Sequence, residues 1–207
     1  MASVPGMAAR PRPGRPSSGA RERILAAGLE VLKSDGYSGL TTAKVAARAG
    51  QNKALIGYHY GSKQGLVAAV AREVTEQITA EVVGGLGEPR TAAELVEGLV
   101  AGIWGVIGRD ERLGRVYFDL ASHSVVEPPV REMMSEMKAN FRSTLHELLG
   151  QIEDGPAPRA RDAAAVFLMA GVEGLALERL DRGETPELRR ARDLWTSSAA
   201  VAISDQS

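Results

Sequence analysis

The sequence predicts an all-α fold in which a small group of three helices precedes a larger helical body. Apolar residues recur three and four positions apart along most of the 207 residues, which is the pattern of amphipathic helices. No segment alternates apolar and polar residues as a half-buried strand does. Glycine and proline gather at 84–89 and 154–158, where they separate the helical segments.

The first 66 residues are expected to form a flexible basic arm and a three-helix domain. Residues 1–18 are rich in proline, glycine, serine and arginine, and such a segment buries too little apolar surface to become ordered. Thr41 and Asn52 are the expected N-caps of two short helices. The expected elements are the arm 1–18, a helix from Ser18 to Asp35-Gly36, a helix from Thr41 to Gly50, a helix 53–59 and a long helix from Lys63 to about Val83, with the small domain at 19–66.

The helical body is expected to span residues 67–203. Thr91 heads its first new helix, and Pro186 opens its last. The expected helices are 91–107, 111–122, 128–153, 159–182 and 187–203.

The composition excludes several classes of protein. Hydrophobic residues make up 44% of the chain and charged residues 25%, which is ordinary for a soluble globular protein. No run approaches the ~20 apolar residues that span a bilayer, and the basic N-terminus lacks the apolar stretch of a secretory signal. The absence of cysteine excludes disulfides and cysteine-type zinc sites. We therefore expect a cytoplasmic protein with no membrane contact and no cofactor.

The net charge of −1 conceals an asymmetry. Residues 1–63 hold ten lysines and arginines against three acidic residues, a balance of +7, so the rest of the chain carries −8. A basic module joined to an acidic one suits a protein that meets a polyanion at one end. Chance segregation of charge plus a basic tail is the alternative explanation.

The two short helices and their glycine-containing turn predict a helix-turn-helix. The first helix would brace the second, whose N-terminal half lies in the DNA major groove. Ala46, Ala47, Ala49 and Gly50 supply the small residues that such a crossing needs. A short helical hairpin within any bundle has the same geometry and is the alternative.

The residues themselves favour the helix-turn-helix. The segments 41–50 (TTAKVAARAG), 51–60 (QNKALIGYHY) and 61–66 (GSKQGL) closely resemble the DNA-binding domain of the TetR family of repressors over about residues 20–70. The family pattern is a first helix ending in Gly-aromatic, a Thr-headed second helix, an Ala-x-x-Ala-Gly turn and a recognition helix ending in Leu-Tyr-x-His-Phe. The chain departs from it at Gln51, at Asn52 and at Gly57, which replaces the family's tyrosine, and Tyr58 is expected to take over part of that contact.

The resemblance and the side-chain chemistry together assign roles in DNA binding. Hydroxyls, lysines and helix N-terminal amides suit phosphates, whereas amides and a lysine at the start of the recognition helix suit base edges. The expected phosphate contacts are Thr41, Thr42, Lys44, Tyr58, His59 and Lys63, and the expected base contacts are Gln51, Asn52 and Lys53.

Each of these roles has a structural alternative. Lys44 and Lys63 could be ordinary solvated cations, and His59 could be a packed core residue. Ile56 and Tyr60 are expected in the core. The arm arginines, Arg10, Arg12 and Arg15, could reach a minor groove, although a plain disordered tail is the simpler interpretation.

The resemblance implies a homodimer whose last two helices, 159–182 and 187–203, form a four-helix interface. An effector pocket would then lie among helices 91–107, 111–122, 128–153 and 159–182. Flexible methionines and flat aromatics suit an apolar or aromatic ligand, although ordinary core is the alternative for each. The candidates are Trp104, Tyr117, Phe118, His123, Met133, Met134, Met137, Phe141, Phe167 and Met169, with His123 a possible polar anchor.

These features predict a ligand-responsive repressor that binds an inverted-repeat DNA operator as a dimer and is released by a small effector. A TetR-like partner-binding module without specific DNA binding is the first alternative. A small helical enzyme is disfavoured, because the three histidines form no persuasive catalytic set and no metal or nucleotide motif is present.

Overall fold

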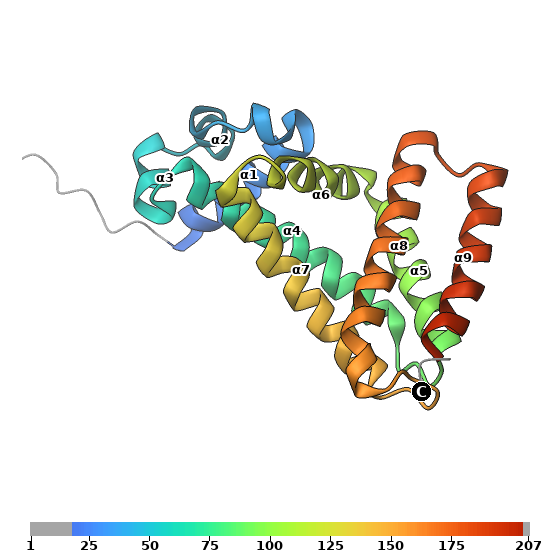
Figure 1. Cartoon of the computed structure of the whole chain (residues 1–207). Coiled ribbons are helices and arrows are strands. Elements are labelled where there is room, and N and C mark those ends of the chain that lie inside the picture. Colours follow the sequence, from blue (N-terminus) through green and yellow to red (C-terminus); the bar gives the residue numbers. More distant parts are fainter. Residues whose placement is uncertain (1–17, 205–207) are drawn as a thin grey trace, which may run out of the picture.

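The computed structural model describes residues 18–204, all of whose regular elements are helices. The all-α prediction is therefore confirmed (Figure 1). Within residues 18–204, no helix has the length and apolar character needed to cross a membrane. The expected arm, with Arg10, Arg12 and Arg15, falls outside the described residues. The elements are α1 (Ser18–Gly39), α2 (Thr42–Ala49), α3 (Lys53–Tyr60), α4 (Lys63–Leu86), α5 (Ala92–Arg109), α6 (Glu111–Ser124), α7 (Pro128–Leu149), the 3₁₀ turn η1 (Pro158–Ala160), α8 (Arg161–Arg182) and α9 (Pro186–Ser204).

The predicted N-caps lie at the helix starts. The side chains of Thr41, Asn52 and Thr91 each accept a hydrogen bond from a backbone N–H in the first turn of α2, α3 and α5. Such caps satisfy donors that a helix start leaves without partners. Gly36 interrupts α1 with a left-handed φ of 68°, which is the break that the sequence predicts there.

The helices form a small head, made of α1, α2 and α3, and a larger body, made of α5 to α9, and both are in contact with α4. Figure 1 shows α1, α2 and α3 gathered near one end of α4, with α8 and α9 on the opposite side of the molecule. Helix α4 packs against α1 and α3 in the head and against α5 and α7 in the body. Helix α1 also packs against α6, so the head contacts the body in a second place.

One apolar core runs through both parts. It extends from Ile24 and Ile56 in the head to Leu168 and Ile203 in the body. Ile56 is buried as expected, and Tyr60 is half-buried against the same core. Because this core is continuous across residue 66, the expected division into two domains stays a prediction.

The expected helix 128–153 is too long at its C-terminal end, because α7 stops at Leu149. Residues 153 and 154 instead form hydrogen bonds with the start of α5. The Glu153 N–H donates to the Arg90 carbonyl, and the Asp154 carboxylate accepts from the Ala92 N–H. These long-range bonds outweigh the helical propensity of the segment. The expected helix 159–182 likewise begins with the separate turn η1 before α8.

The tight passage from α3 to α4 depends on Gly65. A Cβ atom at this position would lie 2.0 Å from the backbone oxygen of Tyr60, so we expect Gly65→Ala to lower the free energy of unfolding by about 1–3 kcal/mol through overpacking. Gly57 is the matched control, since a Cβ there meets nothing within 4 Å. Gly57→Ala should raise stability by up to about 1 kcal/mol through helix propensity. Urea unfolding of both variants measures the contrast, and equal effects would contradict it.

Candidate nucleic-acid interface and effector cavity

Helices α2 and α3 form a helix-turn-helix with an exposed outer side. Gly50 adopts a left-handed φ of 60° after α2, and the Gln51 N–H returns to the Ala46 carbonyl. Val45 and Ala46 of α2 and Ile56 of α3 are buried between the helices and the head. This packing leaves the start of α3 accessible to solvent.

The predicted DNA-contacting residues lie on this outer side or beside it. They come from α2, the turn, α3 and the first residue of α4, so they gather within one short stretch of structure. Thr41, Lys44, Asn52, Lys53 and Tyr58 are exposed, and Thr42, Gln51, His59 and Lys63 are partly exposed. Tyr58 is the most accessible aromatic, with 70% of its surface exposed.

The capping bonds leave hydrogen-bond donors available. The Thr41 hydroxyl oxygen accepts from the Lys44 N–H, which leaves its own O–H proton free to donate. The side-chain oxygen Oδ1 of Asn52 accepts from the Ala54 N–H at 2.9 Å, which leaves the side-chain NH₂ group free to donate. Phosphate oxygens and many base edges are acceptors, so the remaining donors have the polarity that DNA requires.

The lysines differ in their surroundings. Lys44 pairs with Asp35 at 2.6 Å, and this hydrogen bond is the main reason that the pKa of Asp35 is lowered. Lys63 lies over the Tyr37 ring, 5.5 Å from its centre. Lys53 is exposed and forms no ion pair with any residue of the described range. Of these three lysines, Lys53 is therefore the one without such a contact in the described part of the chain and the most accessible to a new partner.

His59 packs beside its aromatic neighbours. Its ring meets the Tyr58 ring edge-on, with centres 5.0 Å apart. Its Nε2 atom is buried and has no hydrogen-bond partner within residues 18–204. Phosphate donation through Nε2 would require the ring to turn outward.

A polar junction connects the head to α6 and α7. The Tyr37 N–H donates to Asp119 at 2.6 Å, and the Tyr37 hydroxyl donates to Glu127. Burial and this bond to a carboxylate raise the pKa of Tyr37 to about 12. His123 lies 4.4 Å from the Tyr37 ring and contacts Glu127, so the histidine considered as a ligand anchor lies in this junction.

Lys33 and Asp110 form a second link between α1 and the start of α6. Their Nζ and Oδ2 atoms lie 2.9 Å apart, and the Lys33 side chain is 10% exposed. Burial raises the pKa of Asp110, but hydrogen bonds from Lys33 and Arg112 outweigh it and hold the value at about 2.

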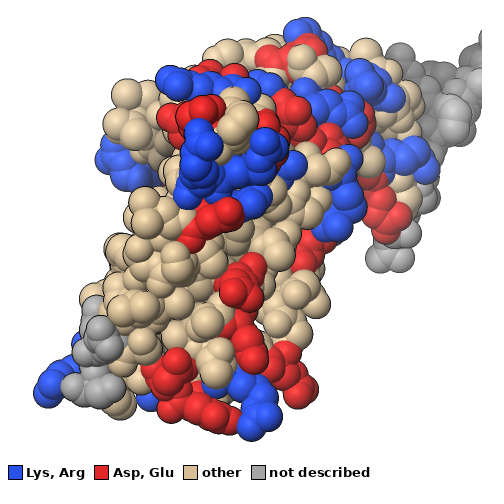
Figure 2. Space-filling model, turned by 90° about the vertical axis from the view of Figure 1, so that its right-hand side faces the viewer, with Lys and Arg blue, Asp and Glu red and all other residues tan. Residues whose placement is uncertain are grey.

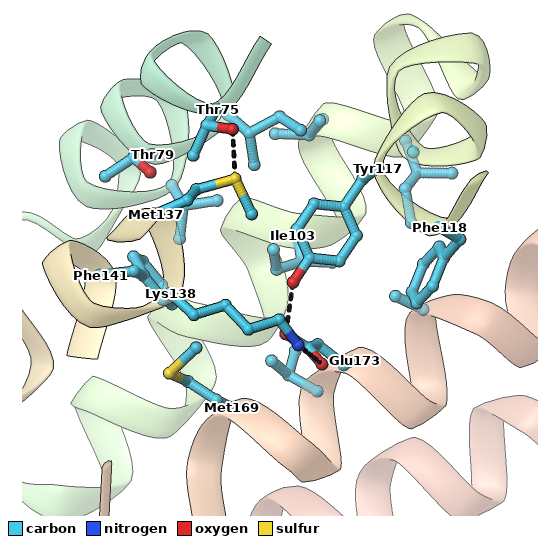
Figure 3. A pocket seen from close by; sticks show the side chains of 17 residues that line it. Thr75, Thr79, Ile103, Tyr117, Phe118, Met137, Lys138, Phe141, Met169 and Glu173 are labelled. Carbon is cyan, nitrogen blue, oxygen red and sulfur yellow. Dashed lines mark hydrogen bonds and ion pairs between the residues drawn. The ribbon is translucent and has the colours of Figure 1, made fainter. Parts of the chain in front are cut away.

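A mostly apolar cavity of about 90 Å³ lies in the body, where α4, α5, α6, α7 and α8 meet (Figure 3). Five predicted pocket residues line it: Tyr117, Phe118, Met137, Phe141 and Met169. An open groove between α4 and α7 adjoins the cavity and shares Thr75, Thr79 and Met137 with it. Met133 lines that groove.

The other predicted pocket residues lie elsewhere. Met134 is buried in the core. Trp104 packs under Arg179 and Arg192 and donates its indole N–H to Glu184. Phe167 faces outward beside Trp195, and His123 belongs to the polar junction.

Sequence reasoning missed one wall of the cavity. Thr75, Ile78, Thr79 and Val82 of α4 line it, and their spacing of three and four residues is the signal that could have included this helix. It also missed Lys138 and Glu173, whose charges suggest surface positions. Glu173 accepts hydrogen bonds from the Tyr117 hydroxyl and from Lys138 (Figure 3).

Helices α8 and α9 carry an exposed apolar face on the side of the molecule that Figure 2 presents. In that view, uncharged residues form a broad stretch on the left, with charged groups above and below it and acidic groups along its right side. Leu194 is 69% exposed. The exposed large apolar residues of these helices are Val166, Phe167, Leu177, Leu194 and Val201.

An outward helix-turn-helix on a larger helical body is the arrangement of DNA-binding transcriptional regulators. The family model described as "Bacterial regulatory proteins, tetR family" matches residues 24–70, and that described as "BetI-type transcriptional repressor, C-terminal" matches residues 106–203. The chain belongs to the TetR family of transcriptional regulators.

Similar proteins agree with this assignment. The HTH-type transcriptional regulator BetI of Cronobacter sakazakii is 26% identical over 187 residues, covering 85% of this chain and 87% of the relative. A transcriptional regulator from Rhodococcus sp. Rha1 has a similar fold, with a TM-score of 0.72 and 22% identity over 89% of this chain and 97% of its own. The multidrug binding protein EbrR, solved with imidazole, gives a TM-score of 0.69 and 22% identity over 89% and 91%.

The Lys33–Asp110 link predicts acid sensitivity. A lowered pKa means that the ionised carboxylate stabilises the fold above about pH 4, and that this stability disappears as the pH falls toward 2. Asp110→Asn keeps a capping oxygen but removes the charge, so we expect it to cost about 1–2 kcal/mol at pH 7. The difference from the unmodified chain should shrink between pH 4 and pH 2 in urea unfolding.

Asp181→Asn is the control, because Asp181 is 75% exposed beside Arg182. It should change stability by only a few tenths of a kcal/mol at any pH. A difference for Asp110→Asn that stayed constant with pH would refute a role for its charge.

Proposed function

We propose that this protein is a repressor that binds an inverted-repeat operator as a homodimer and leaves the DNA when a small apolar or aromatic effector enters the cavity. One observation carries the proposal. Helix α4 lines the cavity with Thr75 and Val82 and begins at Lys63, directly after the recognition helix. A ligand that displaces α4 therefore acts on the position of α3.

The DNA-binding part of the proposal rests on the donors of the head. Lys53, Gln51 and the free amide group of Asn52 stand at the start of α3, where a recognition helix meets base edges. Thr41, Thr42, Lys44, Tyr58, His59 and Lys63 flank it as proposed phosphate contacts.

The dimer rests on the apolar face of α8 and α9. Exposed apolar side chains gathered on one face mark an interaction surface. A two-fold dimer through this face would present two recognition helices, and these would match half-sites about 34–36 Å apart or a multiple of that.

Effector binding rests on the cavity and on the fold it shares with EbrR, which is a multidrug binding protein. Tyr117, Phe118, Met137, Phe141 and Met169 are the proposed contacts. The ligand need only bind more tightly to a head spacing that does not fit the operator, since that difference in affinity shifts the population away from DNA.

Substituting the two lysines should separate phosphate contacts from base contacts. We expect Lys63→Ala to weaken binding to all sequences alike and to lower the slope of log affinity against log salt by about 1. Lys53→Ala should instead change the preference at one base position by about 1–3 kcal/mol. The measurement is fluorescence anisotropy on an operator selected with the unmodified protein and on its single-base variants.

Arg90→Ala is the control, because Arg90 lies in the body and pairs with Glu153. It should leave both the affinity and the salt slope unchanged. Equal, weak affinity of the unmodified chain for every duplex would instead favour the alternative of a partner-binding module, to which Gly57 in place of the family's tyrosine points.

A charge on the α8/α9 face should break the dimer. Leu194→Glu would bury a carboxylate without a partner at the interface, and we expect the dissociation constant to rise by at least about tenfold. Val126→Glu is the matched control, because Val126 is 72% exposed on the loop between α6 and α7. Sedimentation equilibrium of the two variants tests the interface, which is wrong if both remain as dimeric as the parent.

A further inference from the structure

Three side chains from three helices form the charged end of the cavity. The Glu173 carboxylate on α8 accepts from the Lys138 ammonium on α7 at 2.9 Å and from the Tyr117 hydroxyl on α6. The Lys138 ammonium also lies 5.8 Å from the centre of the Tyr117 ring. Figure 3 shows the Lys138 chain extended beside the open space toward Glu173.

The charges at this end balance. Lys138 and Glu173 are the two charged residues among the seventeen that line the cavity. Their side chains are 33% and 28% exposed, so water screens them only in part. Most of the remaining lining is aliphatic, aromatic or methionine side chains, and the Thr75 hydroxyl already donates within its own helix to Ala71.

A charged ligand would upset this balance. A bound carboxylate would place a second negative charge beside Glu173 and share the single positive charge of Lys138, and a bound ammonium would place a second positive charge beside Lys138 and share the single negative charge of Glu173. Either event leaves one charge without a partner in a mostly apolar space, which is strongly unfavourable.

An uncharged ligand with one polar group leaves the pair intact. Lys138 has three N–H donors and Glu173 has several acceptor sites, so each can add a hydrogen bond to a hydroxyl group. The apolar walls then cover the rest of the molecule.

We propose that the Lys138–Glu173 pair, held by Tyr117, is a charge filter that restricts the effector to uncharged apolar or aromatic molecules carrying one hydroxyl-like group. This inference rests on the proposed effector function of the cavity. It goes beyond that function because it names the residues that discriminate against charged ligands, the ion pair of Lys138 and Glu173, which stays intact when an uncharged ligand binds.

The test compares three probes that share a methylbenzene ring: p-cresol, which is uncharged at pH 7, p-toluate, an anion, and 4-methylbenzylammonium, a cation. Titration calorimetry on the full chain should show p-cresol binding at least about tenfold more tightly than either ion. Glu173→Gln keeps an acceptor for Tyr117 but leaves Lys138 unpaired, so p-toluate should gain at least about tenfold relative to p-cresol. Lys138→Met should produce the same gain for the cation.

Two further sets of variants guard the interpretation. The double variant Glu173→Gln/Lys138→Met again has no net charge at this end of the cavity, so it should bind p-cresol more tightly than either ion. It keeps the proposal testable if one of the single variants does not fold. Arg90→Met and Glu153→Gln remove the charges of an exposed pair outside the cavity and should leave all three affinities unchanged.

The outcomes separate the two proposals. Equal or tighter binding of an ion by the unmodified chain, or variants whose preferences fail to move in opposite directions, would overturn the charge filter and leave the cavity as an effector site. Failure of all three probes to bind the unmodified chain would overturn the cavity as an effector site, and the charge filter with it.

Discussion

Helix α4 is one unbroken rod that belongs to the head at its start and to the body at its end. Its 24 residues span about 36 Å at 1.5 Å per residue. Leu66 and Val70 are buried in the first half, whereas Val82 and Leu86 are buried in the second. Because the same helix lines the cavity and only two residues separate its start from the end of α3, the proposed function assigns to α4 the transmission of a displacement at the cavity wall to α3.

The polar junction adds a further connection between the head and the body beside α4 and the shared apolar core. Tyr37 fixes α1 to Asp119 of α6 and to Glu127 at the start of α7. Tyr117, two residues before Asp119, lines the cavity. Residues of both α4 and α6 line the cavity, so under the proposed function a ligand would act on the head through the relative position of these two helices.

The sequence predicted the features that depend on local chemistry. Thr41 and Asn52 are caps because a side-chain oxygen at a helix start has a nearby N–H to satisfy. Which neighbour a helix face meets is a long-range property, and there the predictions were incomplete. Phe167 and Met169 are close in sequence and equally apolar, yet Phe167 is exposed on the α8 surface while Met169 lines the cavity. The Lys138–Glu173 pair joins residues on two different helices, so no spacing rule could reveal it.

The cavity opposes the close packing that otherwise stabilises a helical body. Protein interiors are normally filled to crystal-like density, so the side chains around this cavity of about 90 Å³ have fewer packing partners than fully enclosed core residues have. A ligand in this cavity would contact side chains of five helices at once, so under the proposed function its binding free energy would depend on the arrangement of those helices. In the proposed dimer, that dependence would couple an occupant of the body to the spacing of the two heads.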